Sequence, residues 1–218
     1  SVTGTDAAAC ALFADEMADA LWQSRTETQL DFVRPEAAME TSLAGAPGDK
    51  PFIMADFADN PAGGAYGDSP NLLRHMVDAG LENAAFATIS DPISVQKAIS
   101  AGEGASVSLE IGGRGAPDLT PPLAVKGRVT LISDGDFTCE GPMWKGVDFS
   151  MGPSAVIQVG GIEVILSSVP TAVMDLQVFR CMGIEPSSKT TLALKSRNHF
   201  RVFCGNVGTL TDITLHIK

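Results

Sequence analysis

Histidine, cysteine and basic residues are scarce in this sequence of 218 residues. The three histidines form neither an HExxH nor an HxH pattern, and the four cysteines, Cys10, Cys139, Cys181 and Cys204, include no CxxC pair. A catalytic zinc ion needs three protein ligands that converge on one point, and zinc-knuckle or redox motifs need closely spaced cysteines. We therefore predict that this chain supplies no metal ligands and binds no metal by itself.

Positive charge and long apolar runs are also missing. The formal net charge is −11, which argues against nucleic-acid binding because phosphate neutralisation requires a basic surface. No run is long and apolar enough to span a bilayer, and no secretory signal pattern is present. We expect a cytoplasmic protein with reduced thiols and without a nucleic-acid or membrane partner. The opening residues SVTG resemble the end of a strand, which predicts a piece of a longer protein.

Three familiar motifs are missing as well. The sequence contains neither of the phosphate-binding patterns GxxxxGK[ST] and GxGxxG, and it lacks the GxSxG nucleophile elbow. With no nucleophile motif and no zinc motif, the sequence predicts no catalytic residue in this chain, and the isolated chain is expected to be inactive.

The pattern of apolar runs predicts the fold class. Apolar residues make up 44% of the chain and aromatic residues 6%, which suits one large domain with a core of small and aliphatic side chains. Apolar runs at 51–56 and 84–89 predict two buried strands. Each is followed by a helix signal. The first helix is predicted to have Asp68 or Ser69 as cap, Pro70 at its first position and Gly80 at its end. The second is predicted to have Asp91 as cap, Pro92 in its first turn and Gly102 at its end. This alternation is typical of an α/β domain with parallel strands.

The residues from about 104 to 170 are β-rich, with frequent glycine turns and a predicted hairpin at Gly160–Gly161. The apolar stripe of the first predicted helix is expected to pack on the core. The remaining predicted elements are a strand at Val2–Thr3, helices over 7–25, 35–44 and 175–183, and a strand over 190–196. We predict an α/β layered domain with a mixed, partly parallel sheet flanked by helices and an antiparallel β-rich insertion.

The segment ADFADNPAGGAYGDSP, residues 55–70, lies between a predicted strand and a predicted helix, where open α/β sheets bind their ligands. Its glycines can turn backbone N–H groups inward, but Asp56, Asp59 and Asp68 would repel an anion. We therefore predict a rigid loop in which the carboxylates accept these N–H groups. Exposed Asp59 and Asn60 are then expected to face a ligand, a metal or a partner domain. A purely structural turn with Asp caps is the alternative.

A second candidate segment is LKSRNHFRVF, residues 194–203, which begins at the end of a predicted strand. Histidine titrates near neutrality, and arginine offers a forked partner for a carboxylate. Ser196, His199 and Arg201 are therefore candidate ligand contacts. In the alternative, two phenylalanines anchor the segment and its charges are solvated.

Two metal hypotheses have weaker support. The acidic residues within 134–140 suggest calcium, but the EF-hand pattern is not met, and a hairpin loop explains them better. The isolated chain could also bind a metal through Asp56, Asp59 and His199, and we expect no such site tighter than micromolar.

Taken together, the segments resemble the C-terminal half of the MlrC-like family, named for microcystinase C. DFADNPAGGAYGDSPNLLRHMVDAG resembles the family signature D-x-x-D-N-P-G-G-G-x-x-G-D-S/T. DGDFTCEGPMWKGVDFSMGPSAVIQVGGIEVILSS and LKSRNHFR also resemble this half. Ala62 stands where the family usually has glycine, and Pro70 where it usually has serine or threonine. The resemblance covers essentially all of residues 1–218.

The resemblance implies the C-terminal domain of a zinc metallopeptidase or amidohydrolase that acts on peptide or other amide bonds; the type member cleaves linearised microcystin. It implies that zinc is held by an N-terminal half absent from this sequence, with that half and an amide substrate as partners. A homo-oligomer is left open. The implied substrate contacts are Asp59, Asn60, Asp68, Ser196, His199 and Arg201. The alternative is a non-catalytic ligand-binding or assembly module that docks through the Gly-rich loop.

Overall fold

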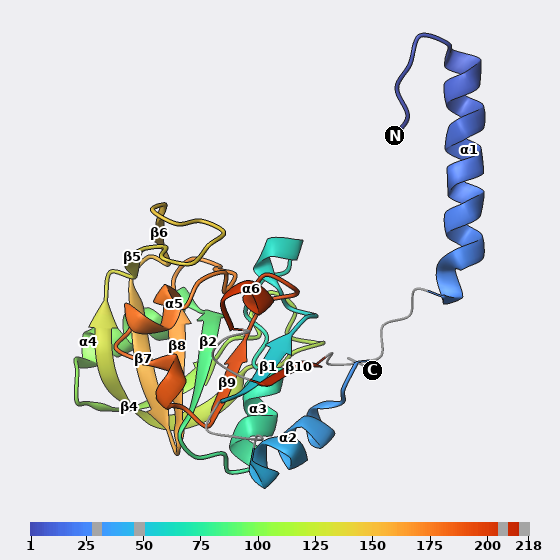
Figure 1. Ribbon diagram of the computed structural model, residues 1–218. Coiled ribbons are helices and arrows are strands. Elements are labelled where there is room, and N and C mark those ends of the chain that lie inside the picture. Colours follow the sequence, from blue (N-terminus) through green and yellow to red (C-terminus); the bar gives the residue numbers. More distant parts are fainter. Residues whose placement is uncertain (28–31, 46–50, 205–208, 214–218) are drawn as a thin grey trace. The chain divides into compact units, whose positions relative to one another are not determined.

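The computed structural model describes residues 1–27, 32–45, 51–204 and 209–213, and for residues 204 and 209–213 it describes only the backbone. The chain divides into two compact units, Ser1–Phe32 and Val33–Lys218 (Figure 1). A search of the described helices finds none with the length and hydropathy needed to cross a membrane.

The first unit contains α1, Ala7–Gln23, and the short 3-10 helix η1, Ser24–Thr26. Helix α1 begins where the sequence predicts, because the Asp6 carboxylate accepts hydrogen bonds from two backbone N–H groups of the first turn, at 2.9 and 3.1 Å. Within this unit, Val2 and Thr3 are not part of a strand. None of the described residues of α1 is buried. Packing of its apolar stripe therefore stays a prediction.

Among the described residues of the second unit, eight strands form one sheet in the order β10-β1-β9-β2-β8-β7-β4-β3 (Figure 1). Neighbouring strands are parallel from β10 to β8 and antiparallel from β8 to β3. The predicted α/β fold with a mixed sheet is therefore confirmed. The strands are β1 Phe52–Asp56, β2 Ala84–Ser90, β3 Ser106–Ile111, β4 Leu123–Ser133, β7 Ser154–Val159, β8 Ile162–Ser167, β9 Thr191–Leu194 and β10 Thr209–Ile213.

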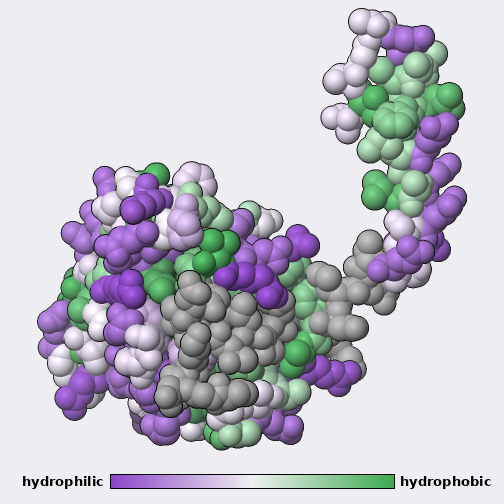
Figure 2. All heavy atoms as spheres, in the orientation of Figure 1, coloured by the Kyte–Doolittle hydropathy of each residue, from purple (hydrophilic) through white to green (hydrophobic). Residues whose placement is uncertain are grey.

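Alternating side chains of the strands divide the core between the two faces of the sheet. Phe52 and Met54 of β1 point to one face, which packs against α2, α3 and α4, whereas Ile53 and Ala55 point to the other, which packs against α5 and α6. The helices of this unit are α2 Pro35–Ala44, η2 Pro61–Gly63, α3 Asn71–Asp78, α4 Pro92–Ala101, α5 Gln177–Arg180, η3 Pro186–Ser188 and α6 Phe200–Cys204. Where Figure 2 colours this unit by hydropathy, hydrophilic residues are spread over the surface and hydrophobic residues form smaller patches.

The antiparallel β-rich region is continuous with the main sheet, because β8 pairs with β7 on one side and with β2 on the other. The hairpin predicted for the acidic segment is present as β5, Asp136–Thr138, paired with β6, Asp148–Ser150. The β7–β8 hairpin is also present, but only Gly160 has a positive φ, at +55°, and not Gly161.

Several predicted details differ from the structure. The helix predicted over 175–183 is a single short turn, α5, which ends at Arg180, although the chain does reverse at the predicted Gly183 with φ of +71°. Pro70 precedes α3 as its cap residue instead of occupying the first helical position. Helix α6 and strand β10 were not predicted. Strand β10 supplies a parallel neighbour to β1, so β1 is flanked on both sides.

Candidate functional site

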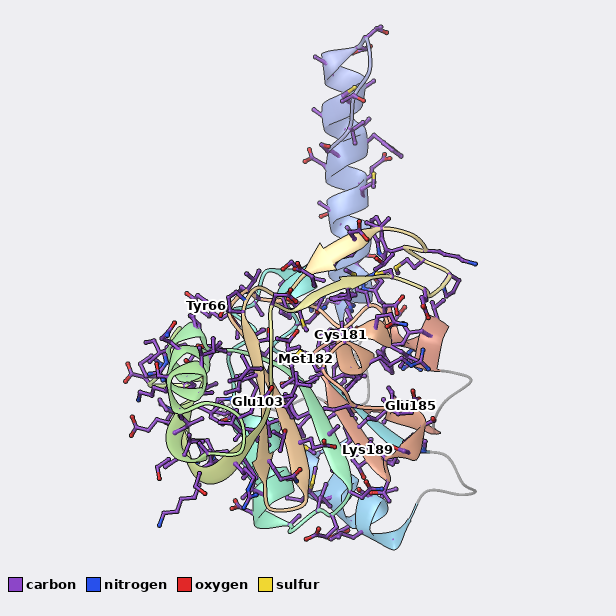
Figure 3. The ribbon with its side chains drawn as sticks, turned by 90° about the vertical axis from the view of Figure 1, so that its left-hand side faces the viewer. Tyr66, Glu103, Cys181, Met182, Glu185 and Lys189 are labelled. Carbon is purple, nitrogen blue, oxygen red and sulfur yellow. The ribbon has the colours of Figure 1, made fainter. Side chains whose placement is uncertain are left out.

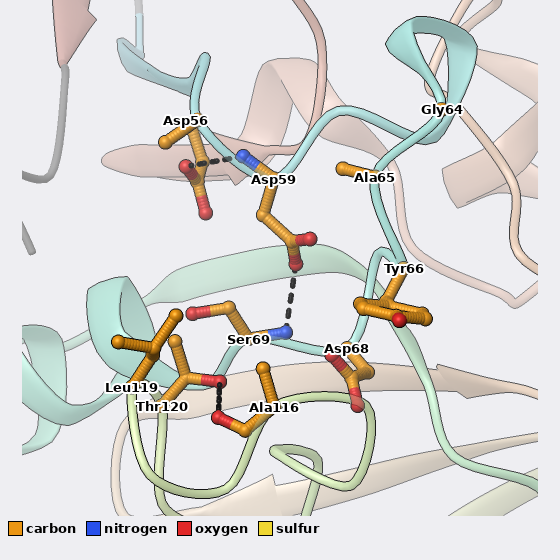
Figure 4. Close-up of a pocket in the computed structure, with 11 residues that line it drawn as sticks. Asp56, Asp59, Gly64, Ala65, Tyr66, Asp68, Ser69, Ala116, Leu119 and Thr120 are labelled. Atoms are coloured by element: carbon orange, nitrogen blue, oxygen red, sulfur yellow. Dashed lines mark hydrogen bonds between the residues drawn. The ribbon is translucent and has the colours of Figure 1, made fainter.

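A pocket of about 320 Å³ lies at the carboxyl end of β1, between the Gly-rich loop and the loop that follows β3 (Figure 4). Open α/β sheets bind ligands at this edge. Figure 3 shows Tyr66 towards the end of the sheet that carries the β5–β6 hairpin, and Lys189 towards the other end. The residues with polar side chains that line the pocket are Asp56, Asp59, Tyr66, Asp68, Ser69 and Thr120.

A buried lysine holds the Gly-rich loop against the sheet. The Nζ atom of Lys195 donates to Asp56 Oδ2 at 3.0 Å, to Asp59 Oδ2 at 2.8 Å and to the Ser69 carbonyl at 2.9 Å, so its three protons are all used. The side chains of Lys195 and Asp56 are fully buried. Burial by itself lowers the pKa of Lys195, but the two carboxylates outweigh it and raise that pKa above its ordinary value.

The aspartates of the loop bind backbone N–H groups, as predicted. Asp59 accepts from the N–H groups of Gly67 at 2.9 Å and Ser69 at 2.7 Å. Asp68 Oδ2 accepts from the N–H groups of Arg114 and Gly115, both at 2.7 Å, and so ties the Gly-rich loop to the loop after β3. The pocket therefore has walls that are fixed by charge-assisted hydrogen bonds.

The expectation that Asp59 and Asn60 are exposed is wrong. Asp59 is 9% exposed and Asn60 is 7% exposed. The Asn60 side chain accepts from the Ala62 N–H at 3.1 Å and so caps η2, away from the pocket lining. A carboxylate that already binds Lys195 and two backbone N–H groups has little capacity left for a ligand, so Asp59 shapes the pocket.

Asp91 joins β2, α4 and the loop after β3. The sequence predicts it only as a helix cap, and that cap is confirmed by a 3.0 Å bond from the Ser94 N–H. It also pairs with Arg114 at 3.0 Å and accepts from the Gly112 N–H at 2.9 Å. Burial raises the pKa of Asp91, but the hydrogen bonds from Arg114, Ser94 and Gly112 together hold it below its ordinary value.

This depressed pKa predicts acid sensitivity. A carboxyl group whose pKa is lower in the folded state stabilises the fold fully above its unfolded pKa, and this contribution is lost as the pH falls through the folded pKa. We expect the free energy of unfolding of the wild type, measured with urea, to decrease as the pH falls from about 5 to about 3. Asp91→Asn should be less stable at pH 6 and should show a flatter pH dependence. The control is Asp118→Asn, which changes an exposed aspartate. If both variants changed the slope of unfolding free energy against pH equally, this prediction would be contradicted.

The second candidate segment lies beside the first without lining the pocket. The Arg197 guanidinium lies 4.7 Å from the ring centroid of Phe57, which places the two segments side by side. Ser196 is fully buried and Arg201 is exposed. Within the described structure, Ser196 Oγ and His199 Nδ1 are buried without a hydrogen-bond partner. Unpaired buried polar atoms of this kind are uncommon.

Lys195 and Arg114 are the functional residues that sequence reasoning missed. Lys195 follows an apolar run, and a lysine that becomes fully buried there needs an ionic partner, which the sequence does not identify. Arg114 lies in a glycine-rich turn and gave no signal, because its partner Asp91 is 23 residues away.

The described residues do not fit a metal ion. No group of three or more histidine, cysteine, aspartate or glutamate side chains among them is arranged to hold one. Asp56 and Asp59 face the Lys195 ammonium group, whose positive charge repels a cation at the same place. The hypothesis of a site built from Asp56, Asp59 and His199 is therefore not supported.

The sheet order and the locked Gly-rich loop define an α/β domain with a pocket at the carboxyl edge of its parallel strands. The family model "MlrC C-terminus" matches residues 54–207, and the chain belongs to this family.

The chain is 33% identical over 171 residues to microcystinase C from Sphingomonas sp., an alignment that covers 78% of this chain. It also resembles the crystal structure of a "putative metallopeptidase" from Mesorhizobium sp. BNC1, with a TM-score of 0.80 and 24% identity over 92% of this chain. The alignments cover 33% of microcystinase C and 39% of the crystallised chain, so this chain spans little more than a third of either relative.

Proposed function

We propose that this chain is the substrate-contacting C-terminal part of a zinc-dependent metallopeptidase or amidohydrolase that acts on peptide or other amide bonds. The observation that carries the proposal is the pocket whose wall is the family's signature loop, fixed by Lys195. The names of the two relatives support a peptidase role. A bound zinc ion lowers the pKa of a water molecule and polarises the amide carbonyl. Its ligands would come from an N-terminal half, because the described residues of this chain do not fit a metal.

The residues of this chain would bind and orient the substrate. Asp59 and Asp68 fix the two loops, and the hydroxyl groups of Ser69 and Tyr66 line the pocket, where they can bind a peptide group. His199 has an unpaired ring nitrogen, and Arg201 is an exposed cation on the same segment. We propose that one of them pairs with a substrate carboxylate or with the oxyanion that develops at the amide.

A kinetic experiment tests this proposal. In the full-length protein, His199→Ala or Arg201→Ala should lower kcat/KM for a peptide substrate at least tenfold, because the oxyanion or carboxylate loses its partner. His75→Ala, which changes a histidine of α3, is the matched control and should leave kcat/KM within twofold. Unchanged kinetics in both test variants would remove these residues from the site. A full-length protein that bound no zinc and hydrolysed no peptide would favour the non-catalytic binding module.

A further inference from the structure

A second pocket, of about 250 Å³, lies beside the β5–β6 hairpin on the sheet face that carries α5. Three segments form it: the hairpin, the chain that follows β8 and the beginning of α5. Its walls are mainly apolar, and the side chains that make them are Phe137, Phe149, Val169, Pro170, Met174 and Val178. The rings of Phe137 and Phe149 stack with centroids 6.1 Å apart, which gives the pocket a flat aromatic wall.

The polar side chains of this pocket are already used within the protein. Asp175 is 3% exposed, and its two oxygens accept from the N–H groups of Gln177 at 2.9 Å and Gly141 at 2.6 Å. The Thr171 hydroxyl donates to the Val169 carbonyl at 3.0 Å. None of the residues described as lining the pocket is a lysine, arginine or histidine. An anionic ligand group would therefore lose its hydration without gaining a cationic partner, whereas an apolar group has little hydration to lose.

Cys139, which also lines this pocket, adds no charge near neutral pH. Burial, together with the nearby Asp175 carboxylate, raises the pKa of its thiol to about 11. A protonated thiol behaves as a small apolar group, so it extends the apolar wall.

The second pocket is connected to the first through Lys195. The chain after β8 crosses the carboxyl ends of the parallel strands, where Thr88 Oγ1 donates to the Thr171 carbonyl at 3.1 Å and the Val173 N–H donates to the Lys195 carbonyl at 3.2 Å. The Nζ atom of the same lysine binds Asp56 and Asp59 in the wall of the first pocket. Segments that form the two pockets therefore both hydrogen-bond to Lys195, one to its backbone carbonyl and the other to its ammonium group.

The volume of the second pocket fits a single side chain. An apolar cavity of about 150 Å³ is large enough to bind benzene. A pocket of about 250 Å³ therefore has room for a phenyl ring or a branched aliphatic group and for the atoms that attach it to a backbone.

We propose that this second pocket is the subsite for an uncharged aromatic or aliphatic side chain of the substrate whose polar backbone occupies the first pocket. The assignment to a substrate rests on the proposed function, whereas the capacity to bind an apolar group rests on the pocket alone. The enzyme would thus select amides with an apolar side chain near the cleaved bond.

Direct binding to the 218-residue chain tests the pocket. The probe is N-phenyl-1-naphthylamine, an uncharged aromatic dye, titrated by fluorescence. Ala172→Phe fills the pocket with a ring. Val169→Asp introduces a charge into the pocket wall at a residue that is 46% exposed. Each variant should weaken binding of the dye at least tenfold. Ala101→Phe, at the exposed end of α4, is the matched control and should bind as the wild type does. Absence of binding to the wild type, or equal binding by Val169→Asp, would overturn the proposal.

Kinetics of the full-length protein test the assignment to a substrate. Two peptides that differ only in having phenylalanine or glutamate beside the cleaved amide should differ at least tenfold in kcat/KM. Val169→Asp should narrow that ratio by raising KM for the phenylalanine peptide. Hydrolysis of both peptides with an unchanged ratio would overturn the subsite. Hydrolysis of neither peptide would overturn the proposed function instead. The dye titration alone would then show whether the second pocket binds an apolar group.

Discussion

Lys195→Met should lower the free energy of unfolding by about 3–5 kcal/mol, the largest effect expected of any single substitution discussed above. Methionine keeps the length of the side chain but removes the charge that faces Asp56 and Asp59. Both the lysine and Asp56 are fully buried, so the carboxylates would remain in a low-dielectric site without their cation. Urea unfolding followed by circular dichroism measures the change.

Two further variants isolate the charge. Lys97→Met changes an exposed lysine of α4 and should alter the unfolding free energy by no more than about 0.5 kcal/mol. Combining Lys195→Met with Asp56→Asn and Asp59→Asn removes the uncompensated negative charge and should recover part of the loss. A Lys195→Met protein as stable as the wild type would show that the buried ion pairs do not hold the loop.

Gly112→Ala should lower the unfolding free energy by at least about 3 kcal/mol, from backbone strain and steric overlap together. Gly112 has φ of +66°, where residues other than glycine are strained. A Cβ atom at this position would also overlap the carbonyl oxygen of Asp68, which accepts a 2.7 Å bond from the Gly113 N–H. The substitution would push the Gly-rich loop away from the loop after β3 and open the pocket.

Gly80→Ala is a closely matched control. Gly80 has φ of +65°, almost the same as Gly112, but an added Cβ atom would meet nothing within 4 Å. Gly80→Ala should therefore cost only the strain, about 1–2 kcal/mol, in the same urea experiment. Equal losses in the two variants would mean that contact between the two loops contributes nothing measurable.

Local sequence signals predicted much of the fold. Helix α2 begins and ends at the predicted residues, and α4 has the predicted Asp91 cap and Gly102 end, because caps and prolines act within one helical turn. The strands β1 and β2 follow their apolar runs. The helix predicted over 175–183 is only one turn long, because helix propensity is a weak guide to the length of so short a segment.

The site was only partly predictable, because its defining contacts are distant in sequence. The Gly-rich loop and its carboxylate-bound N–H groups follow from local residue types. By contrast, Lys195 is 139 residues from Asp56, and Arg114 is 46 residues from Asp68. Periodicity and motif spacing do not identify contacts between residues so far apart in the sequence. The second pocket gave no signal either, because its walls come from three separate segments.

The position of β9 in the sheet bears on how the chain is made. This strand, Thr191–Leu194, lies between β1 and β2, although its first residue is synthesised 135 residues after the end of β1 and 101 residues after the end of β2. A nascent chain that has not yet emerged beyond residue 190 therefore has a gap at the centre of its sheet, and Asp56 is still without its lysine. The first pocket can reach its final form only after this late strand is inserted, so translation itself delays the maturation of the pocket.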